Sequence, residues 1–207
     1  MKEHGFMRVT CVTPKVAIGN VAVNLEEHLR VIKEDNYGET DAIDDYGTES
    51  NLSVFPELSL TGYTCEALFA QKSLQHQTLD AIRRLADQAK GWRSTVIVGA
   101  PIFVEEDGTL RNCAVVIGGH EGVLGIVPKT YLPNYREFYE SRWFAGARPT
   151  DPQMIDIGWP HEVPFGADLL FQPKTYGNPK WTFGIEICED VWSPIPPSSY
   201  QALAGAT

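Results

Sequence analysis

The sequence lacks several features that would place a protein in a class at once. No apolar run approaches the roughly 20 residues that a membrane-spanning helix needs, and the N-terminus, Met-Lys-Glu-His-Gly, has no apolar stretch typical of a signal peptide. The 4 cysteines form no CxxC pair, and no histidine lies at metal-ligand spacing from them. A chain of this size also needs no disulfide scaffold. We therefore expect a cytoplasmic protein with reduced thiols and no bound metal.

Basic residues are also scarce. The chain has 17 lysines and arginines against 27 acidic residues, a net charge of -10, which repels phosphate backbones and argues against nucleic-acid binding. Residues 34–49 contain acids and no base, and we interpret them as a solvated loop because they have little apolar content to bury. Their spacing does not match an EF-hand. These acids are Glu34, Asp35, Glu39, Asp41, Asp44, Asp45 and Glu49.

The chain has enough apolar residues for one globular domain. Of its 207 residues, 43% are hydrophobic and 11% aromatic, so a substantial core is expected. Strands are predicted over residues 6–12, 52–55 and 95–100, then in a hairpin meander over 102–104, 112–117 and 123–127, and again over 168–171 and 181–187.

Helices are predicted between these strands. One is capped by Asn24, one carries a buried stripe from Leu68 to Leu85 and ends near Gly91, and one starts at Ser198 and runs to the end of the chain. Residues 148–166 are rich in Pro and Gly and indicate connecting structure. Strands, crossover helices and a hairpin meander together favour an α+β protein with a mixed sheet.

Three reactive side chains lie at the ends of predicted strands. Glu57 follows the strand 52–55, Lys129 follows 123–127, and Cys188 follows 181–187. Hydrolysis of an amide through a covalent intermediate needs a nucleophile, a base and a group that stabilises the oxyanion, and these three residue types can fill those roles. Strand ends place side chains accurately, which makes the combination a candidate catalytic site.

Each of the three residues also has an ordinary structural interpretation. A cysteine after an apolar strand is commonly a small buried hydrophobe, a glutamate after proline a surface cap, and a lysine at a strand exit a solvated charge. Cys11, Cys65 and Cys113 are interpreted as buried thiols without a role. Composition and spacing alone leave these alternatives open.

The sequence around the three residues resembles a known family. Phe-Pro-Glu-Leu at 55–58, the lysine at 129 and Gly-Ile-Glu-Ile-Cys-Glu-Asp at 184–190 resemble the ordered Glu, Lys and Cys motifs of the nitrilase superfamily. Residues 58–63, 128–140 and 190–199 are similar, more narrowly, to the glutaminase domain of glutamine-dependent NAD synthetases. The likeness covers nearly all of residues 1–207.

The resemblance implies a fold and a role for each residue. The fold would be a four-layer α-β-β-α sandwich, C-terminally incomplete. Cys188 would be the nucleophile, Glu57 the general base and Lys129 the oxyanion-stabilising group, with the Lys129 ammonium favouring the thiolate. The backbone N–H of Glu189 would be a second oxyanion donor.

Further residues are implied around the substrate. Tyr135 matches a glutamine-contacting residue of the family, and Tyr63 would be core or pocket wall, as would Trp192. Glu137 occupies the place of a supporting second glutamate, or is a surface ion-pair partner.

The resemblance also implies partners. Glutamine would be the substrate, and ammonia would pass to an ATP-dependent NAD synthetase domain that residues 1–207 lack. ATP and magnesium would belong to that domain, whereas glutamine hydrolysis would need no cofactor. Relatives of full length suggest a homo-oligomer. A separate nitrilase-type amidase acting on another small amide, an inactive truncated fragment and a Cys-His protease are the alternatives, the last disfavoured because no histidine lies in a supporting motif.

Overall fold

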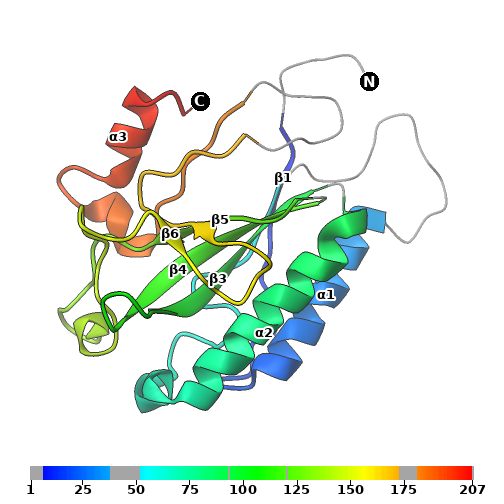
Figure 1. The fold of residues 1–207 in the computed structure, drawn as a ribbon, viewed down its shortest axis with the longest axis horizontal. Helices are drawn as coiled ribbons and strands as arrows, with labels where there is room; N and C mark the ends of the chain where they lie inside the picture. The colour runs from blue at the N-terminus through cyan, green and yellow to red at the C-terminus, as the bar shows by residue number, and fades with distance from the viewer. Residues whose placement is uncertain (1–6, 38–51, 93, 120, 173–180, 207) are drawn as a thin grey trace.

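The computed structural model describes residues 7–37, 52–92, 94–119, 121–172 and 181–206 (Figure 1). The first residue of the predicted strand 6–12 and the acidic residues from Glu39 to Glu49 lie outside these ranges. Glu34 and Asp35 are described, and they lie in a helix instead of the predicted loop. Asp35 accepts hydrogen bonds from Thr10 at 2.9 Å and Ser53 at 2.5 Å, so this carboxylate joins the helix to two strands.

One mixed sheet of five strands forms the centre of the molecule. The strands are β1 (Val9–Cys11), β2 (Leu52–Val54), β3 (Thr95–Val104), β4 (Thr109–Gly118) and β5 (Gly122–Pro128), and they neighbour one another in that order. β1, β2 and β3 are parallel, whereas β3, β4 and β5 form an antiparallel meander. The α+β class and the meander are confirmed. The predicted strands 95–100 and 102–104 are one continuous strand, because Pro101 pairs within the ladder opposite Asn112.

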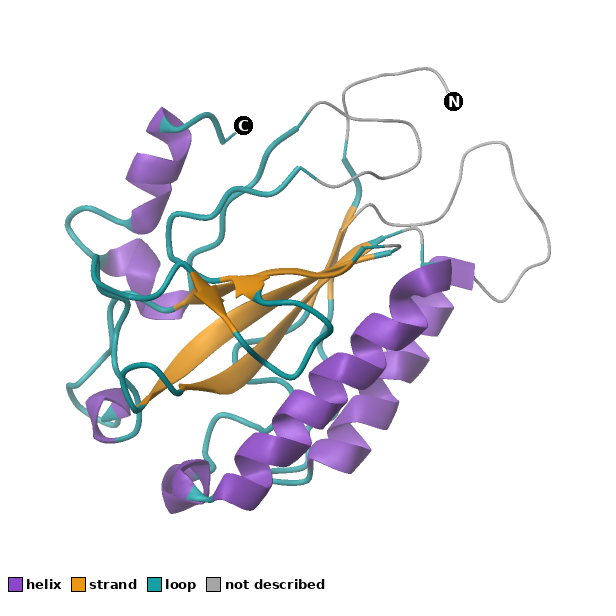
Figure 2. Cartoon of the chain, viewed as in Figure 1, coloured by secondary structure: helices purple, strands orange, loops and turns teal. Residues whose placement is uncertain are grey.

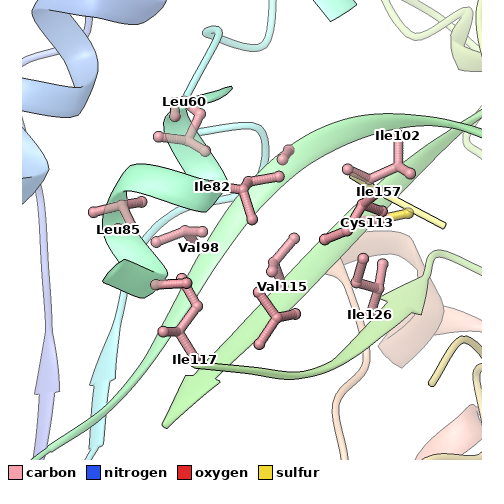
Figure 3. Packing of buried hydrophobic residues seen from close by; sticks show 14 of the residues in the cluster. Leu60, Ile82, Leu85, Val98, Ile102, Cys113, Val115, Ile117, Ile126 and Ile157 are labelled. Atoms are coloured by element: carbon pink, nitrogen blue, oxygen red, sulfur yellow. The ribbon is translucent and has the colours of Figure 1, made fainter. Parts of the chain in front are cut away.

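Two long helices, α1 (Val21–Tyr37) and α2 (Lys72–Gln88), lie side by side and cover one face of this sheet (Figure 1). Buried side chains such as Ile82, Leu85, Val98 and Val115 fill the space between helix and strands (Figure 3). Burying each such side chain contributes about 1.5–3 kcal/mol before the entropy cost of folding. This core fixes the sheet whose strand ends carry candidate site residues.

The helix boundaries differ from the predicted ones. α1 begins at Val21, and Asn20 accepts the amide hydrogen of Val23 at 3.2 Å, so Asn20 and not Asn24 is the polar side chain at the helix start. Asn24 is fully buried and donates to the carbonyls of Ala17 and Leu60.

The predicted second helix is divided. Leu68 lies in a separate 3-10 helix, η1 (Glu66–Ala70), and its side chain is exposed, so it is not part of the buried stripe of α2. A further 3-10 helix, η2 (Ala89–Gly91), follows α2.

The opposite face of the sheet is covered by less regular chain (Figure 2). The short pair β6 (Met154–Ile155) and β7 (Val163–Pro164) lies beside β5, and Ile155 and Val163 pack in the same core cluster as α1 and α2. The remaining elements are the 3-10 helices η3 (Glu140–Arg142) and η4 (Cys188–Trp192) and the helix α3 (Pro197–Leu203). α3 starts at Pro197 and ends at Leu203, which corrects the prediction of a helix from Ser198 to the end of the chain. None of the described helices has the length and apolar character needed to cross a membrane.

The strands predicted over 168–171 and 181–187 are not formed as such. Phe171 and Phe183 exchange two backbone hydrogen bonds of 2.9 and 3.0 Å, but this is a single bridge. The neighbouring backbone groups bond to side chains: the Ile185 carbonyl accepts from Gln201 at 2.8 Å, and the Ile187 amide donates to Asp190 at 2.9 Å. Side chains therefore replace a strand neighbour along the segment that leads to Cys188.

Candidate active site

Glu57 stands on a tight loop that follows β2. The loop lies directly on β3 at Gly99, where a Cβ atom would collide with the backbone nitrogen of Leu58. Leu60 donates its amide hydrogen to the Gly99 carbonyl at 3.1 Å, and Leu58 has a positive φ of 52° that turns the chain. A glycine in β3 thus allows the loop to approach the sheet and fixes the backbone of Glu57.

Lys129 follows the last residue of β5, and its side chain is fully buried. Its Nζ donates to Glu57 Oε1 at 2.6 Å and to both carboxylate oxygens of Glu140, at 2.8 and 3.1 Å. Burial opposes the charge of Lys129, but the carboxylates of Glu57 and Glu140 outweigh it and raise the lysine pKa. Lys129 is therefore a fixed cation.

Glu140, and not Glu137, is the second glutamate beside Lys129. Glu140 is buried and accepts hydrogen bonds from Lys129, from Asn112 at 3.5 Å and from the Tyr63 hydroxyl at 2.5 Å. Glu137 is exposed and makes no side-chain hydrogen bond or ion pair within the described part of the chain. The sequence left Glu137 as either a supporting glutamate or a surface ion-pair partner, and the structure gives the supporting position to Glu140, because the turn before η3 carries residue 140 inward.

Asn112 is a site residue that sequence reasoning missed. It lies in β4, is buried, and its amide group donates to Glu57 Oε1 at 2.6 Å, the same oxygen that Lys129 contacts. Two donors on one oxygen hold the Glu57 carboxylate in one orientation and leave its other oxygen for a further partner. The only sequence signal for this role is that Asn112 is a polar residue in the largely apolar strand β4. Its place beside Glu57 follows from the pairing of β4 with its neighbours.

Cys188 begins η4 with a positive φ of 48°, an uncommon conformation for a residue with a Cβ. Cys188 is exposed, and its thiol lies close enough to Glu57, Lys129 and Glu140 for the charges of all three to act on its pKa. Glu57, Lys129 and Cys188 therefore converge, although the segment before Cys188 is not the predicted strand.

The protonation state of Cys188 differs from the prediction. Partial burial of the thiol raises its pKa, the Glu57 charge raises it further, and the opposing effect of Lys129 is smaller. Burial and the Glu57 charge thus favour the neutral thiol over the thiolate in the resting site.

Tyrosines and glutamates surround the Cys188 thiol. Tyr135 is exposed and donates its hydroxyl hydrogen to Glu189 at 2.9 Å, a bond that raises the tyrosine pKa. Burial and the bond to Glu140 raise the pKa of Tyr63 as well, so it remains a neutral donor. The backbone N–H of Glu189 has no acceptor among the described residues. Trp192 is 76% exposed, so it is not part of the core.

The other cysteines make no hydrogen bond with Glu57, Lys129 or Glu140 in the described parts of the chain. Cys65 and Cys113 are buried as predicted, and burial raises the pKa of both thiols. Cys11 is exposed, which corrects its interpretation as a buried thiol, because it lies at the end of the short edge strand β1.

Comparison with known proteins decides the family. The family model described as carbon-nitrogen hydrolase matches residues 8–201. The chain belongs to the carbon-nitrogen hydrolase family. It is 42% identical over 209 residues to the glutamine-dependent NAD(+) synthetase of Mycobacterium tuberculosis, and 31% identical over 201 residues to that of Aquifex aeolicus. These alignments cover 99% and 97% of this chain but only 28% and 29% of the two relatives.

Solved structures of other proteins share the fold. The glutamine-dependent NAD+ synthetase of Acinetobacter baumannii superposes with a TM-score of 0.66 at 25% identity, over 96% of this chain and 30% of that one. Saccharomyces cerevisiae Nit3, a nitrilase superfamily member, superposes with a TM-score of 0.61 over 97% of this chain and 61% of its own, and at 16% identity it shows the fold alone.

Proposed function

We propose that this carbon-nitrogen hydrolase removes the side-chain amide of glutamine and releases ammonia for NAD synthesis. The observation that carries the proposal is the buried Lys129 ammonium, held between Glu57 and Glu140, beside an accessible Cys188 thiol. The identity of 42% to glutamine-dependent NAD(+) synthetases supports glutamine as the amide.

The reaction begins with a neutral thiol. Cys188 Sγ attacks the amide carbon while Glu57 accepts the thiol proton, and the carbonyl oxygen becomes an oxyanion. Glu57 then donates that proton to the amide nitrogen, the C–N bond breaks, and ammonia leaves a glutamyl thioester on Cys188. Water attacks the thioester and gives its proton to Glu57, and glutamate leaves as the thiol is restored. Because the resting thiol is neutral, the base is needed in the first step.

Two donors are proposed to stabilise the oxyanion: the Lys129 ammonium and the backbone N–H of Glu189. Lys129 is already fixed by two carboxylates, so no rearrangement is needed when charge develops. Tyr135, Glu189 and Tyr63 are proposed to contact glutamine. Tyr63 donates to Glu140, which also binds Lys129, and this bond supports a position of Tyr63 in the wall of the substrate pocket.

The partners follow from the same proposal. Ammonia would pass to an NAD synthetase domain, which would use ATP and magnesium, whereas the glutaminase step needs no cofactor because the three side chains supply nucleophile, base and cation. We also propose a cytoplasmic homo-oligomer. The four cysteines are free thiols, and several large apolar side chains on η4 and α3 are exposed. These side chains are Val191, Trp192, Tyr200 and Leu203.

The proposal is tested by ammonia release from glutamine. Cys188→Ala should abolish release, whereas Cys11→Ala, the loss of the other exposed thiol, should leave it unchanged. Asparagine and short aliphatic amides serve as competing substrates. Faster release from those amides than from glutamine would favour the alternative of a separate amidase.

The longer protein gives a second test. In a chain extended to the length of the synthetase relatives, Cys188→Ala should stop glutamine-dependent NAD synthesis but leave synthesis from free ammonia nearly intact. Glutamine-dependent synthesis by Cys188→Ala at the parent rate would overturn the thioester mechanism.

A further inference from the structure

Asp190 joins two parts of the candidate active site that come from distant parts of the sequence. Its side chain is buried, at 2% exposure. Oδ1 accepts the backbone amide hydrogens of Thr130 at 3.1 Å and Tyr131 at 2.7 Å, and Oδ2 accepts that of Ile187 at 2.9 Å. Thr130 directly follows Lys129, and Ile187 directly precedes Cys188. One carboxylate thus holds the backbone on both sides of the site.

A helix cap alone does not account for this arrangement. A capping role explains the bond to Ile187, three residues earlier, but not the two bonds to the segment after β5. No backbone–backbone hydrogen bond joins residues 129–131 to residues 185–192 in the described parts of the chain. The Asp190 carboxylate therefore makes the buried link between residues 129–131 and the turn that carries Cys188, and the bond of Tyr135 to Glu189 is a second, exposed link.

The chain around Cys188 depends on such a link. Cys188 has a positive φ of 48°, and the described residues before it form one β-bridge and bond to Ser198 and Gln201 of α3. A strained conformation persists only where its surroundings hold it. Charge-assisted hydrogen bonds to backbone amides are roughly twice as strong as neutral ones, so three of them can supply that hold.

We propose that Asp190 is a positioning residue that sets the Cys188 thiol against Glu57 and Lys129. The expected effect on glutamine turnover rests on the proposed function, whereas the expected effect on the position of the Cys188 thiol does not. Asp190 touches no reacting atom. It acts by fixing the turn that carries the nucleophile to the strand end that carries the cation.

Asp190→Asn tests the proposal because it keeps the size of the side chain. An amide offers one acceptor oxygen, and its NH2 group would face a backbone N–H, so one side of the link is lost. Asp156→Asn is the matched control, since the exposed Asp156 also accepts a backbone amide hydrogen, from Gly158 at 2.7 Å, in the loop between β6 and β7. The first measurement is iodoacetamide labelling of each cysteine across pH, read by mass spectrometry, which needs no enzymatic activity.

In the parent chain, Glu57→Gln should shift the pH profile of Cys188 labelling to lower pH, because the Glu57 charge raises the thiol pKa. In Asp190→Asn the Cys188 profile should approach that of the exposed Cys11, and Glu57→Gln should no longer shift it. Asp156→Asn should behave as the parent. For ammonia release from glutamine, Asp190→Asn should lower kcat on the order of 10²-fold with little change in KM, the effect of a misplacement of about 1 Å.

Two results would overturn the inference. One is a Cys188 profile in Asp190→Asn that still responds to Glu57→Gln as in the parent. The other is labelling of the buried Cys113 in Asp190→Asn, which would show that Asp190 supports the whole fold instead of the local turn. A parent chain that releases no ammonia would contradict the proposed function, and the labelling comparison would still decide the role of Asp190.

Discussion

The two halves of the candidate site are built in different ways. Glu57 and Lys129 follow strands of one five-stranded sheet, and their side chains are 16% and 0% exposed. Cys188 comes from a 3-10 helix at the end of an irregular segment, and it is exposed. The charged half is thus held by the core, and the nucleophilic half is held by a few side-chain bonds.

This difference matches what each half has to do. A cation and a base stabilise a developing charge best when they are fixed beforehand and shielded from water. A nucleophile must be reached by its substrate, so it cannot be buried in the same way. We therefore expect loss of the buried cation in the charged half to affect both activity and folding stability, and substitutions in the Cys188 half to affect mainly activity. Four predictions test this comparison.

Glu57→Gln should give the largest loss of activity, on the order of 10²–10⁴-fold in turnover, because the base is removed at its fixed position. Lys129 keeps its bond to Glu140, and Asn112 keeps a carbonyl acceptor at residue 57, so stability should change little. Ammonia release and thermal unfolding measure the two effects. Glu66→Gln is the control, because Glu66 is an exposed carboxylate that accepts one tyrosine hydroxyl. Ammonia release by Glu57→Gln at the parent rate would contradict the role of Glu57.

Lys129→Met should lower turnover by roughly 10²–10³-fold, the usual loss for one oxyanion donor. It should also lower the free energy of unfolding by about 3–5 kcal/mol, because it leaves two carboxylates, Glu57 and Glu140, without their shared cation in a buried site. Urea unfolding at neutral pH measures the stability change.

Lys90→Met is the control for that substitution, since Lys90 is exposed and its nearest acid, Asp87, is 4.0 Å away. Its stability should stay within about 0.5 kcal/mol of the parent. If Lys129→Met lowered turnover without any loss of stability, the buried ion pairs of Lys129 would not contribute to folding, which contradicts the comparison.

Glu140→Gln and Glu137→Gln should separate the two glutamates of one motif. Glu140 loses one of the two negative charges that hold Lys129, so turnover should fall by about tenfold, equivalent to roughly 1.4 kcal/mol. Glu137 is exposed, and its substitution should have no effect. Ammonia release at saturating glutamine measures both. A larger effect at residue 137 would contradict the assignment from the structure.

Sequence patterns predict the sheet well because its strands are apolar over most of their length. β3, β4 and β5 are almost entirely buried, and turn residues mark their ends. The same reasoning fails on the opposite face. Residues 168–171 and 181–187 have strand-like composition, but their backbone groups bond to side chains such as Gln201 and Asp190, which no local pattern reveals.

The site divides in the same way. Glu57 and Lys129 are predictable as reactive groups at strand ends, and Cys188 gains its weight from the family resemblance. Glu140 and Asn112 are not predictable from the sequence, because their roles depend on how the turn after residue 132 and the register of β4 place them. The neutral state of the Cys188 thiol also depends on geometry, since it reflects a balance between Glu57 and Lys129.

The last predicted effect concerns acid stability, and it arises where α1 packs on the loop that carries Glu57. His28 lies in α1 and is fully buried. Its Nδ1–H donates to the Asn24 carbonyl at 2.6 Å, which leaves Nε2 to accept from the Ser59 hydroxyl at 2.9 Å, and its ring stacks on Phe55 with centroids 4.2 Å apart. His28 therefore connects α1 to the loop that carries Glu57, and this connection needs the neutral ring.

Burial lowers the pKa of His28 to about 4, although the Asn24 carbonyl and the Glu27 charge oppose the shift. In the unfolded chain a histidine has a pKa near 6.5. Above that pH neither state binds the proton, so the stability is constant; as pH falls from about 6.5 to 4, only the unfolded chain binds it, and stability falls. The loss should reach about 2 kcal/mol at pH 5.

Urea unfolding at pH 7 and pH 5 should show this loss in the parent and in His76→Gln, whose histidine is exposed, but a smaller loss in His28→Gln. An equal loss in all three proteins would mean that the acid sensitivity arises elsewhere, and that the bonds of His28 between α1 and the Glu57 loop do not depend on pH.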